Sequence, residues 1–215
     1  MTGDPATSSF CGDPATPSFC GDAATVDFYQ ANAETYADWS QDRGVPKSIQ
    51  RFAASLPSEA AVADLGCGAG WASAWLQGQG FAVTAFDPVP AMVALTAARG
   101  VTATLGGAEA LPVAAFDGLW CNAALQHIPR ADLPAALARI AAALRPGGRL
   151  FLSIHEGDET LRDRLGRLYV HHREADLRAA LAACGIETLE VSLGSGQGFD
   201  GRPITMLRLD ATREA

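Results

Sequence analysis

Short apolar runs alternate with amphipathic segments over most of the chain. Each run is bounded by glycine, proline or an acidic residue, and the segments between the runs carry apolar residues at helical spacing. The expected strands are 61–65, 81–86, 101–105, 116–121 and 149–154. The expected helices are 26–39, 46–56, 71–77, 90–99 and 132–144, the last of them capped by Asp132. Strands that alternate with helices predict an open parallel sheet with helices on both faces.

The C-terminal part of the chain departs from this alternation. An arginine-rich stretch at 160–169 is expected to be helical, and another helix at 174–184 ends before Gly185. The last two strands, 186–193 and 203–209, are separated only by a glycine-rich loop. Strands that are joined without a crossover helix pair in antiparallel fashion, so these two should form a hairpin at one edge of the sheet.

The N-terminal residues form a short repeat. A unit that begins at Gly3 recurs almost unchanged from Gly12, and a weaker third copy follows. Glycine, proline, aspartate and serine dominate these residues, so the segment buries little apolar surface and we predict a disordered tail over 1–25. A thiol pair formed by Cys11 and Cys20 is the less favoured, functional alternative for this repeat.

Composition and charge narrow the class of protein. The remainder of the 215-residue chain, 26–215, has the length of one compact domain. The net charge of −8 repels phosphate backbones and argues against a nucleic-acid partner. The sequence has no apolar run near the roughly 20 residues of a membrane helix, and no secretory signal. Its five cysteines are scattered without a C-x-x-C pair, which argues against disulfides or a zinc knuckle. We therefore expect a cytoplasmic protein that acts on a small molecule; its oligomeric state stays open.

The most informative stretch is V-A-D-L-G-C-G-A-G at 62–70, where an apolar run ends in an acid and a glycine-rich turn opens a helix. Glycine permits positive φ angles and a close approach of the backbone to a ligand. The helix that follows offers free N–H groups to polar or anionic groups. The D-x-G-x-G-x-G spacing differs from the G-x-G-x-x-G of dinucleotide sites and from the G-x-x-x-x-G-K-[ST] of phosphate loops. The stretch therefore predicts a nucleotide-like ligand without identifying it.

This spacing resembles motif I of the class I S-adenosylmethionine (SAM)-dependent methyltransferases, and the likeness extends over 29–210. The resemblance implies a Rossmann-like, doubly wound α/β fold. Its seven-stranded sheet would be mostly parallel, with an antiparallel C-terminal hairpin strand. The resemblance also implies SAM as the cofactor and methyl transfer to an oxygen or nitrogen of a small-molecule acceptor.

The acids that end the first two strands are the principal candidates for cofactor binding. In the resembling family, an acid at the position of Asp64 faces the methionyl amine of SAM, directly or through water. Glycines at the positions of Gly66 and Gly68 let the backbone pass under the ligand. We interpret Cys67 between them as a small loop residue rather than a reactive thiol. Asp87 ends the second strand, where a carboxylate accepts two hydrogen bonds from a ribose diol.

The same resemblance identifies residues for the adenine ring. Pro88 and Met92 stand where the family places apolar residues against adenine, with a core role for Met92 as the alternative. The stretch G-G-A-E-A-L-P is similar to the A-D-A-E-x-L-P of the family, but Gly107 replaces the aspartate that reads the adenine amine. We therefore expect the backbone of Ala108 and the side chain of Glu109 to make this contact.

Two tyrosines precede the first strand. The pattern Y-x-x-N-A-x-x-Y, which contains Tyr29 and Tyr36, is similar to a segment that covers the SAM site in many small-molecule methyltransferases. The alternative is that both rings pack an N-terminal helix on the domain.

Asn122 and His127 are the candidates for the chemistry itself. Asn122 ends the fourth strand, where the resemblance places it beside the transferring methyl group. The N-A-A-L that it begins lacks the [DN]-P-P-[YF] motif of enzymes that methylate amino groups of DNA and proteins, and no Pro-Cys nucleophile is present. Gln126-His127 is similar to the E-H pair of quinone-precursor O-methyltransferases, but Gln126 is neutral and a poor ligand for hard metals, so a metal-independent reaction is predicted. His127 is a candidate general base, and the alternative is that it orders its loop by hydrogen bonding.

The remaining histidines lie in two segments after the fifth strand. His155 begins an H-E-G-D-E loop. The loop could supply a base, bind a metal or bind the acceptor, but we prefer the interpretation that it is only a solvated loop. Adjacent residues point apart, so at most one of His171 and His172 should line an acceptor pocket.

Two other functions stay open. A non-catalytic SAM-binding protein would carry the same binding residues as an enzyme. An NAD(P)-dependent oxidoreductase is disfavoured by the glycine spacing. The Y-x-x-x-K of short-chain dehydrogenases is represented only by Tyr169 and Arg173, and an arginine does not give up its proton.

Overall fold

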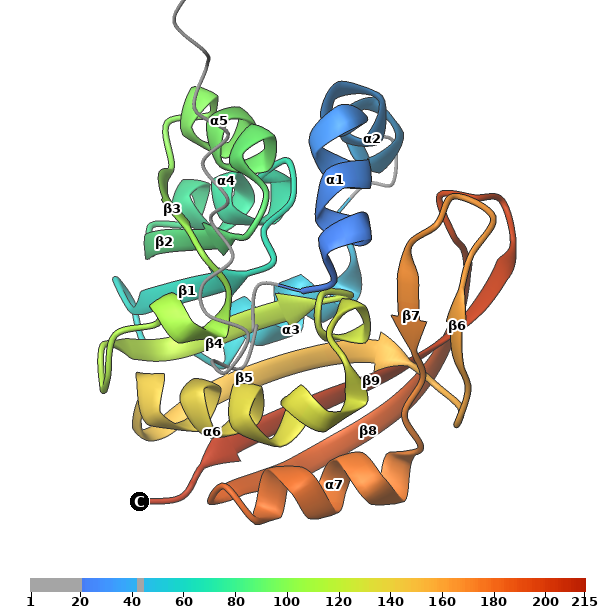
Figure 1. Ribbon diagram of the computed structural model, residues 1–215. Coiled ribbons are helices and arrows are strands. Elements are labelled where there is room, and N and C mark those ends of the chain that lie inside the picture. Colours follow the sequence, from blue (N-terminus) through green and yellow to red (C-terminus); the bar gives the residue numbers. More distant parts are fainter. Residues whose placement is uncertain (1–20, 42–44) are drawn as a thin grey trace, which may run out of the picture.

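The centre of the protein is a seven-stranded sheet, shown in Figure 1, in a computed structural model that describes residues 21–41 and 45–215. In spatial order the strands are β3 (Thr102–Leu105), β2 (Ala82–Asp87), β1 (Ala61–Leu65), β4 (Phe116–Asn122), β5 (Leu144–His155), β9 (Pro203–Arg213) and β8 (Ile186–Gln197). The first five pair in parallel, and β9 pairs antiparallel with both of its neighbours. The predicted Rossmann-like fold with a C-terminal hairpin is therefore confirmed.

Helices cover both faces of the sheet. They are α3 (Lys47–Ala54), α4 (Trp71–Gly78), α5 (Pro90–Ala98), α6 (Leu133–Ala143) and α7 (Glu174–Ala182). Side chains of a strand alternate between faces. Trp120 and Phe151 point to the face that α3 and α4 cover, where their rings stack at 4.0 Å. Leu119 and Leu150, one residue earlier, point to the face that α6 and α7 cover. This alternation builds two separate cores from one set of strands.

The order of the strands determines at which edge of the sheet a ligand is expected to bind. From β1 the chain crosses through α4 and α5 to β2 and β3 on one side, and then returns to β4 and β5 on the other. Ligands of open α/β sheets bind at the carboxyl ends of the strands where this direction reverses. The glycine loop, Asp87 and Asn122 follow or end β1, β2 and β4, so all three lie at this edge.

Helices α1 (Ala23–Ala31) and α2 (Ala33–Gln41) lie across the ligand edge, as Figure 1 shows. We expected one helix from residue 26, but the carboxylate of Asp22 accepts the backbone N–H of Thr25 at 3.0 Å and starts the helix at Ala23. Helix α1 thus begins inside the expected tail of 1–25. Residues 1–20 of that tail, including both of its cysteines, lie outside the described residues.

The expected helix at 160–169 is wrong. These residues form a two-stranded hairpin of β6 (Thr160–Arg162) and β7 (Leu168–Val170). Asp163 stabilises the turn, because its Oδ1 accepts the backbone N–H groups of Leu165 and Arg167 at 2.9 Å each. Gly166 completes the turn with a φ of +84°. An aspartate that bonds to nearby backbone N–H groups favours a turn over a helix.

Three local features complete the chain. Single 3-10 turns occur at Ala108–Ala110, Leu125–His127 and Arg130–Asp132. The turn before α6 replaces the expected cap, and the side chain of Asp132 makes no capping hydrogen bond. Strand β8 extends to Gln197 and pairs with β9, so much of the expected glycine-rich loop is strand.

In the described part of the chain no helix is long and apolar enough to cross a membrane.

Candidate active site

The glycine loop is held tightly between β2 and the end of β4. The backbone N–H groups of Gly66 and Cys67 both donate to the carbonyl of Phe86, at 2.8 and 3.1 Å. Gly66 has a φ of +72°, and a Cβ atom there would lie 2.3 Å from the Cβ of Ala124. Only glycine meets both constraints, which is the physical reason for this residue in the motif.

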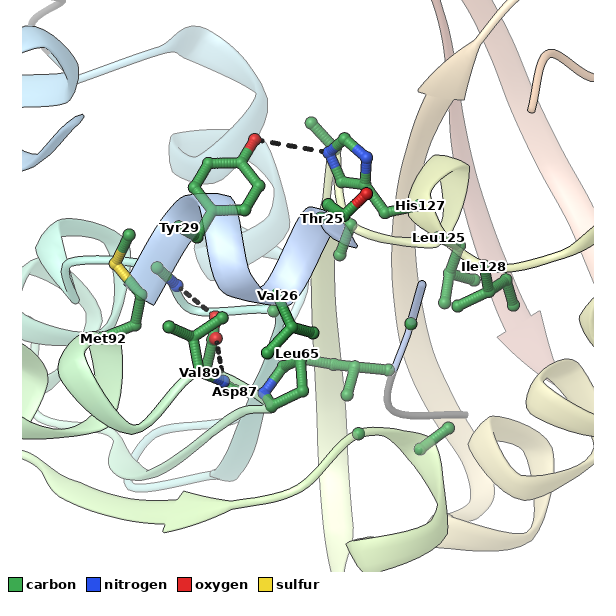
Figure 2. Close-up of a pocket in the computed structure, with 18 of the residues that line it drawn as sticks. Thr25, Val26, Tyr29, Leu65, Asp87, Val89, Met92, Leu125, His127 and Ile128 are labelled. Atoms are coloured by element: carbon green, nitrogen blue, oxygen red, sulfur yellow. Dashed lines mark hydrogen bonds between the residues drawn. The ribbon is translucent and has the colours of Figure 1, made fainter. Parts of the chain in front are cut away.

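The carboxylate of Asp87 is buried beside this loop. Its Oδ2 accepts the N–H of Gly68 at 2.9 Å, and its Oδ1 accepts the N–H of Val89 at 3.0 Å; both bonds are dashed in Figure 2. Burial raises the pKa of Asp87 to about 6, although the two N–H groups work in the opposite direction. The group is therefore fixed in orientation, and each oxygen keeps a lone pair for a ligand hydroxyl.

A cavity opens over these groups and under α1. It is lined by most of the residues predicted to bind the cofactor or act in catalysis: Tyr29, Tyr36, Gly66, Gly68, Asp87, Pro88, Met92, Ala108, Asn122 and His127. The same cavity is lined by residues that we did not predict: Gly21, Thr25, Val26, Leu65, Val89, Gly107, Ala123, Ala124, Leu125 and Ile128. Thr25 and Val26 share a helix face with Tyr29, three or four residues on, and this spacing was an available signal.

Three predicted cofactor residues do not line the cavity. Asp64 is buried below the loop and accepts the hydroxyl of Ser73 at 2.5 Å. Burial raises the pKa of Asp64 to about 7, the Ser73 hydrogen bond lowers it, and the nearby Asp87 raises it further.

The other two residues bond within their own neighbourhoods. The thiol of Cys67 is buried against the hydroxyl of Thr96 at 3.4 Å, and burial raises its pKa, which fits a packing role. The carboxylate of Glu109 accepts the N–H of Gly107 at 2.7 Å. This bond holds the Glu109 carboxylate against its own loop.

His127 joins the cavity to the hairpin of β6 and β7. Its Nδ1 lies 2.7 Å from the carbonyl oxygen of Leu168, and its Nε2 lies 3.4 Å from the hydroxyl of Tyr29. A carbonyl only accepts, so Nδ1 carries the proton of the neutral ring. Burial lowers the pKa of His127 to about 4, so the ring is neutral near pH 7. The lone pair is then on Nε2, on the side that Tyr29 approaches in Figure 2.

Asn122 is oriented by a neighbouring strand. Its Oδ1 accepts the hydroxyl of Ser153 at 2.7 Å, and the Ser153 oxygen in turn accepts the N–H of Ala123 at 3.0 Å. Ala123 has a φ of +57°, which turns the chain sharply into the cavity wall. The side-chain nitrogen of Asn122 remains as a donor for a ligand.

The remaining histidines lie near a second cavity. His155 and His171 line it together with Tyr169, and the ring of His155 stacks on that of Tyr169 at 4.9 Å. His172 instead lies 3.4 Å from the guanidinium of Arg130. Among the described residues, no group of three histidine, cysteine or acidic side chains is arranged to hold a metal ion.

Comparison with known proteins identifies the family. Residues 35–190 match the family described as methyltransferase domain. The chain belongs to this family. The methyltransferase domain thus agrees with the class I resemblance of its glycine loop, and SAM is the methyl donor of that class, as predicted. This assignment argues against the alternative of an NAD(P)-dependent oxidoreductase.

Curated relatives of the methyltransferase domain are similar over part of their length. A ubiquinone biosynthesis O-methyltransferase of Xylella fastidiosa (strain M23) is 36% identical over 105 residues, which is 45% of this chain and 42% of the relative. A trans-aconitate 2-methyltransferase of Mycobacterium sp. (strain KMS) is 35% identical over 128 residues, 57% of this chain and 49% of the relative. The chain thus spans less than half the length of these two relatives.

Solved structures share the fold over nearly the whole methyltransferase domain. One is a 1,6-didemethyltoxoflavin-N1-methyltransferase of Burkholderia thailandensis, solved with 1,6-didemethyltoxoflavin and S-adenosylhomocysteine. It is 26% identical, with a TM-score of 0.72 over 90% of this chain and 88% of its own. The [4+2]-cyclase SpnF also has a TM-score of 0.72, over 95% of this chain and 99% of its own, at 18% identity. The second likeness shows the fold alone.

Proposed function

We propose that this protein transfers the methyl group of SAM to an oxygen or nitrogen of a small-molecule acceptor, without a metal ion, in the cytoplasm. The observation that carries the proposal is the shared cavity: a fixed carboxylate and glycine loop of the SAM-binding type face a neutral histidine across it. The relatives with O- and N-methyltransferase names support a small-molecule acceptor, as does the acidic net charge of the chain.

The residues present suit SAM. Asp87 would accept hydrogen bonds from the ribose hydroxyls. Pro88 and Met92 would offer apolar contact to the adenine ring, and the backbone of Ala108 would bond to its polar edge. The glycine loop would pass under the cofactor, and Asp64 lies below it as a buried counter-charge for the methionyl amine, acting through water. Tyr29 and Tyr36, from α1 and α2, would cover the bound cofactor.

A sulfonium carries its own leaving group, so the protein needs to align the acceptor with the methyl group and exclude water. Helix α1 covers the cavity and serves both purposes. Asn122, held by Ser153, would donate a hydrogen bond and orient the acceptor or the cofactor.

His127 would take the proton that a hydroxyl or amine acceptor loses. Burial makes an imidazolium unfavourable in the resting protein, as the lowered pKa shows. During transfer, however, the sulfonium loses its positive charge while the ring gains one. The net charge of the cavity stays constant, so the proton can move as the methyl group moves.

The proposal of metal independence rests on Gln126. Its side-chain nitrogen donates to the carbonyl of Ala123 at 2.6 Å, and the side chain is buried. A neutral amide in this position is a weak ligand for a hard divalent cation.

Isothermal titration of the purified protein with SAM, with NADH as a parallel control, tests the cofactor. Formation of S-adenosylhomocysteine in a screen of hydroxylated and amine acceptors then tests the transfer. SAM binding with no turnover on any acceptor would favour a non-catalytic SAM-binding protein, or other chemistry on this fold such as that of the cyclase SpnF. Absence of SAM binding would overturn the proposal.

A further inference from the structure

A buried ion pair lies in the turn between β6 and β7, next to the candidate base. The guanidinium of Arg167 donates to Oδ2 of Asp163 from Nε at 3.0 Å and from Nη2 at 2.7 Å. Both side chains are almost completely inaccessible, at 1% and 0% exposure. The other oxygen of Asp163 accepts two backbone N–H groups of the turn, so this carboxylate is fully bonded.

The remaining side of the guanidinium faces α1, the helix that covers the cavity. Nη1 of Arg167 donates to the hydroxyl of Tyr29 at 2.8 Å. The guanidinium carbon also lies 5.0 to 5.6 Å from the ring centres of Phe28, Tyr29, Tyr169 and Phe199. The pair therefore connects the hairpin to α1 through one specific hydrogen bond and several ring contacts.

The direction of the hydrogen bonds from Arg167 to His127 is determined at both ends. An arginine only donates, so the Tyr29 oxygen accepts from Arg167 and its own proton is free to be given to His127. The Leu168 carbonyl only accepts, so Nδ1 of the ring is protonated and Nε2 is the acceptor. The 3.4 Å contact between Tyr29 and Nε2 is thus a bond from the hydroxyl to the ring.

We propose that Arg167 is a positioning residue for His127: through the Tyr29 hydroxyl it keeps Nε2 unprotonated and oriented toward the cavity, until an acceptor hydroxyl or amine replaces Tyr29 at that nitrogen. This inference rests on the proposed role of His127 as the base. Arg167 itself stays behind Tyr29 and does not line the cavity.

Stability alone does not account for this arrangement. A buried ion pair is often no more stable than apolar residues of similar volume, because both charges lose their hydration. A turn closed by Asp163 and Gly166 requires no guanidinium, and the surrounding rings would accept an apolar side chain. What an apolar residue lacks is the donor that sets the direction of the Tyr29 hydroxyl.

The test reads the ring nitrogens of His127 by NMR in the full chain with ¹⁵N-labelled histidine. The protein has four histidines, and the His127 signals are assigned by their loss in His127→Gln. The variants are Tyr29→Phe, Arg167→Lys and both together. A lysine keeps the charge beside Asp163, so the fold is retained, but it has no second nitrogen for Tyr29.

We expect Arg167→Lys to shift the Nε2 signal in the same direction as Tyr29→Phe. Each should raise the pH midpoint of His127 by about 0.5 to 1, the size that one neutral hydrogen bond to the unprotonated ring corresponds to. In the double variant the lysine should add nothing further, because its effect passes through the hydroxyl that phenylalanine lacks.

Two results would overturn the proposal. Additive effects in the double variant would mean that Arg167 acts on His127 by charge alone, and an unchanged His127 in Arg167→Lys would mean that it acts only in the fold. Arg162→Lys is the matched control: Arg162 also ties the hairpin to α1, through Asp22, but does not contact Tyr29, so His127 should not respond. The NMR result needs neither SAM nor acceptor, so it is separable from a failure of the proposed function, which the SAM titration reports.

Discussion

Asp87 and Gly68 are joined by a 2.9 Å hydrogen bond between carboxylate and backbone N–H, which ties the end of β2 to the glycine loop after β1. The predicted ribose ligand is thus also a structural support of the loop beneath the cofactor. Substitutions of Asp87 therefore need a variant that keeps an acceptor for Gly68.

Asp87→Asn should weaken SAM binding by roughly 1–3 kcal/mol, because it removes the charge and one of the acceptors that a ribose diol needs. Its amide oxygen still serves one of the two backbone N–H groups, so the loop is retained. Calorimetric titration with SAM measures the effect, and Asp158→Asn, on an exposed side chain, is the control. Unchanged SAM affinity in Asp87→Asn would remove the ribose assignment.

SAM affinity should increase between about pH 5 and pH 8. Burial raises the pKa of Asp87 to about 6 and of Asp64 to about 7, so both are partly protonated in this range without ligand. Because folding raises the pKa of each carboxyl group, its protonated form stabilises the ligand-free fold below pH 3.8, the usual pKa. That contribution to stability is lost as the pH rises through 6 to 7. The cationic cofactor prefers the ionised carboxylates and lowers both pKa values.

Binding of SAM near pH 6 should therefore release protons. Titrations in buffers of different ionisation enthalpy measure this release directly. A binding enthalpy that is independent of the buffer would contradict the coupling of these two carboxylates to the cofactor.

Gly66→Ala should destabilise the fold by roughly 1–3 kcal/mol, because it adds a methyl group against Ala124 at a left-handed backbone position. The matched control is Gly78→Ala at the end of α4, where a Cβ meets nothing within 4 Å. There we expect a neutral effect or a gain of up to about 1 kcal/mol. Urea unfolding of both variants makes the comparison, and equal stabilities would contradict the close approach at Gly66.

What could be predicted from the sequence is mostly what local chemistry determines. The glycine loop and Asp87 each follow directly on a short apolar strand pattern, and the structure places both at the predicted edge of the sheet. The arginine-rich stretch at 160–169 is a hairpin and not the expected helix, because Asp163 and Gly166 form a turn. The sequence predicts a contact of Glu109 with adenine, whereas in the structure its carboxylate accepts the N–H of Gly107 two residues earlier.

Contacts between distant segments are beyond such reasoning. The link from Arg167 to Tyr29 spans most of the chain and depends on how the hairpin and α1 fold back on the sheet. The same is true of the ion pair between Asp22 and Arg162, which joins the start of α1 to the hairpin. Neither pairing leaves a local pattern, so both become visible only in the folded structure.

His127→Ala should leave SAM affinity unchanged and slow methyl transfer by about 10²- to 10⁴-fold, the usual contribution of a general base. The assay is single-turnover formation of S-adenosylhomocysteine with an acceptor found in the screen. At saturating SAM the wild-type rate should also be flat from about pH 6 to 8 and fall only toward the pKa of about 4, where the ring becomes protonated and its lone pair is lost. A rate that instead rises through pH 6.5, the pKa of an ordinary histidine, would mean that the working base is an exposed group. Retention of the full rate in His127→Ala would return the ring to the loop-ordering role that its bond to Leu168 already performs.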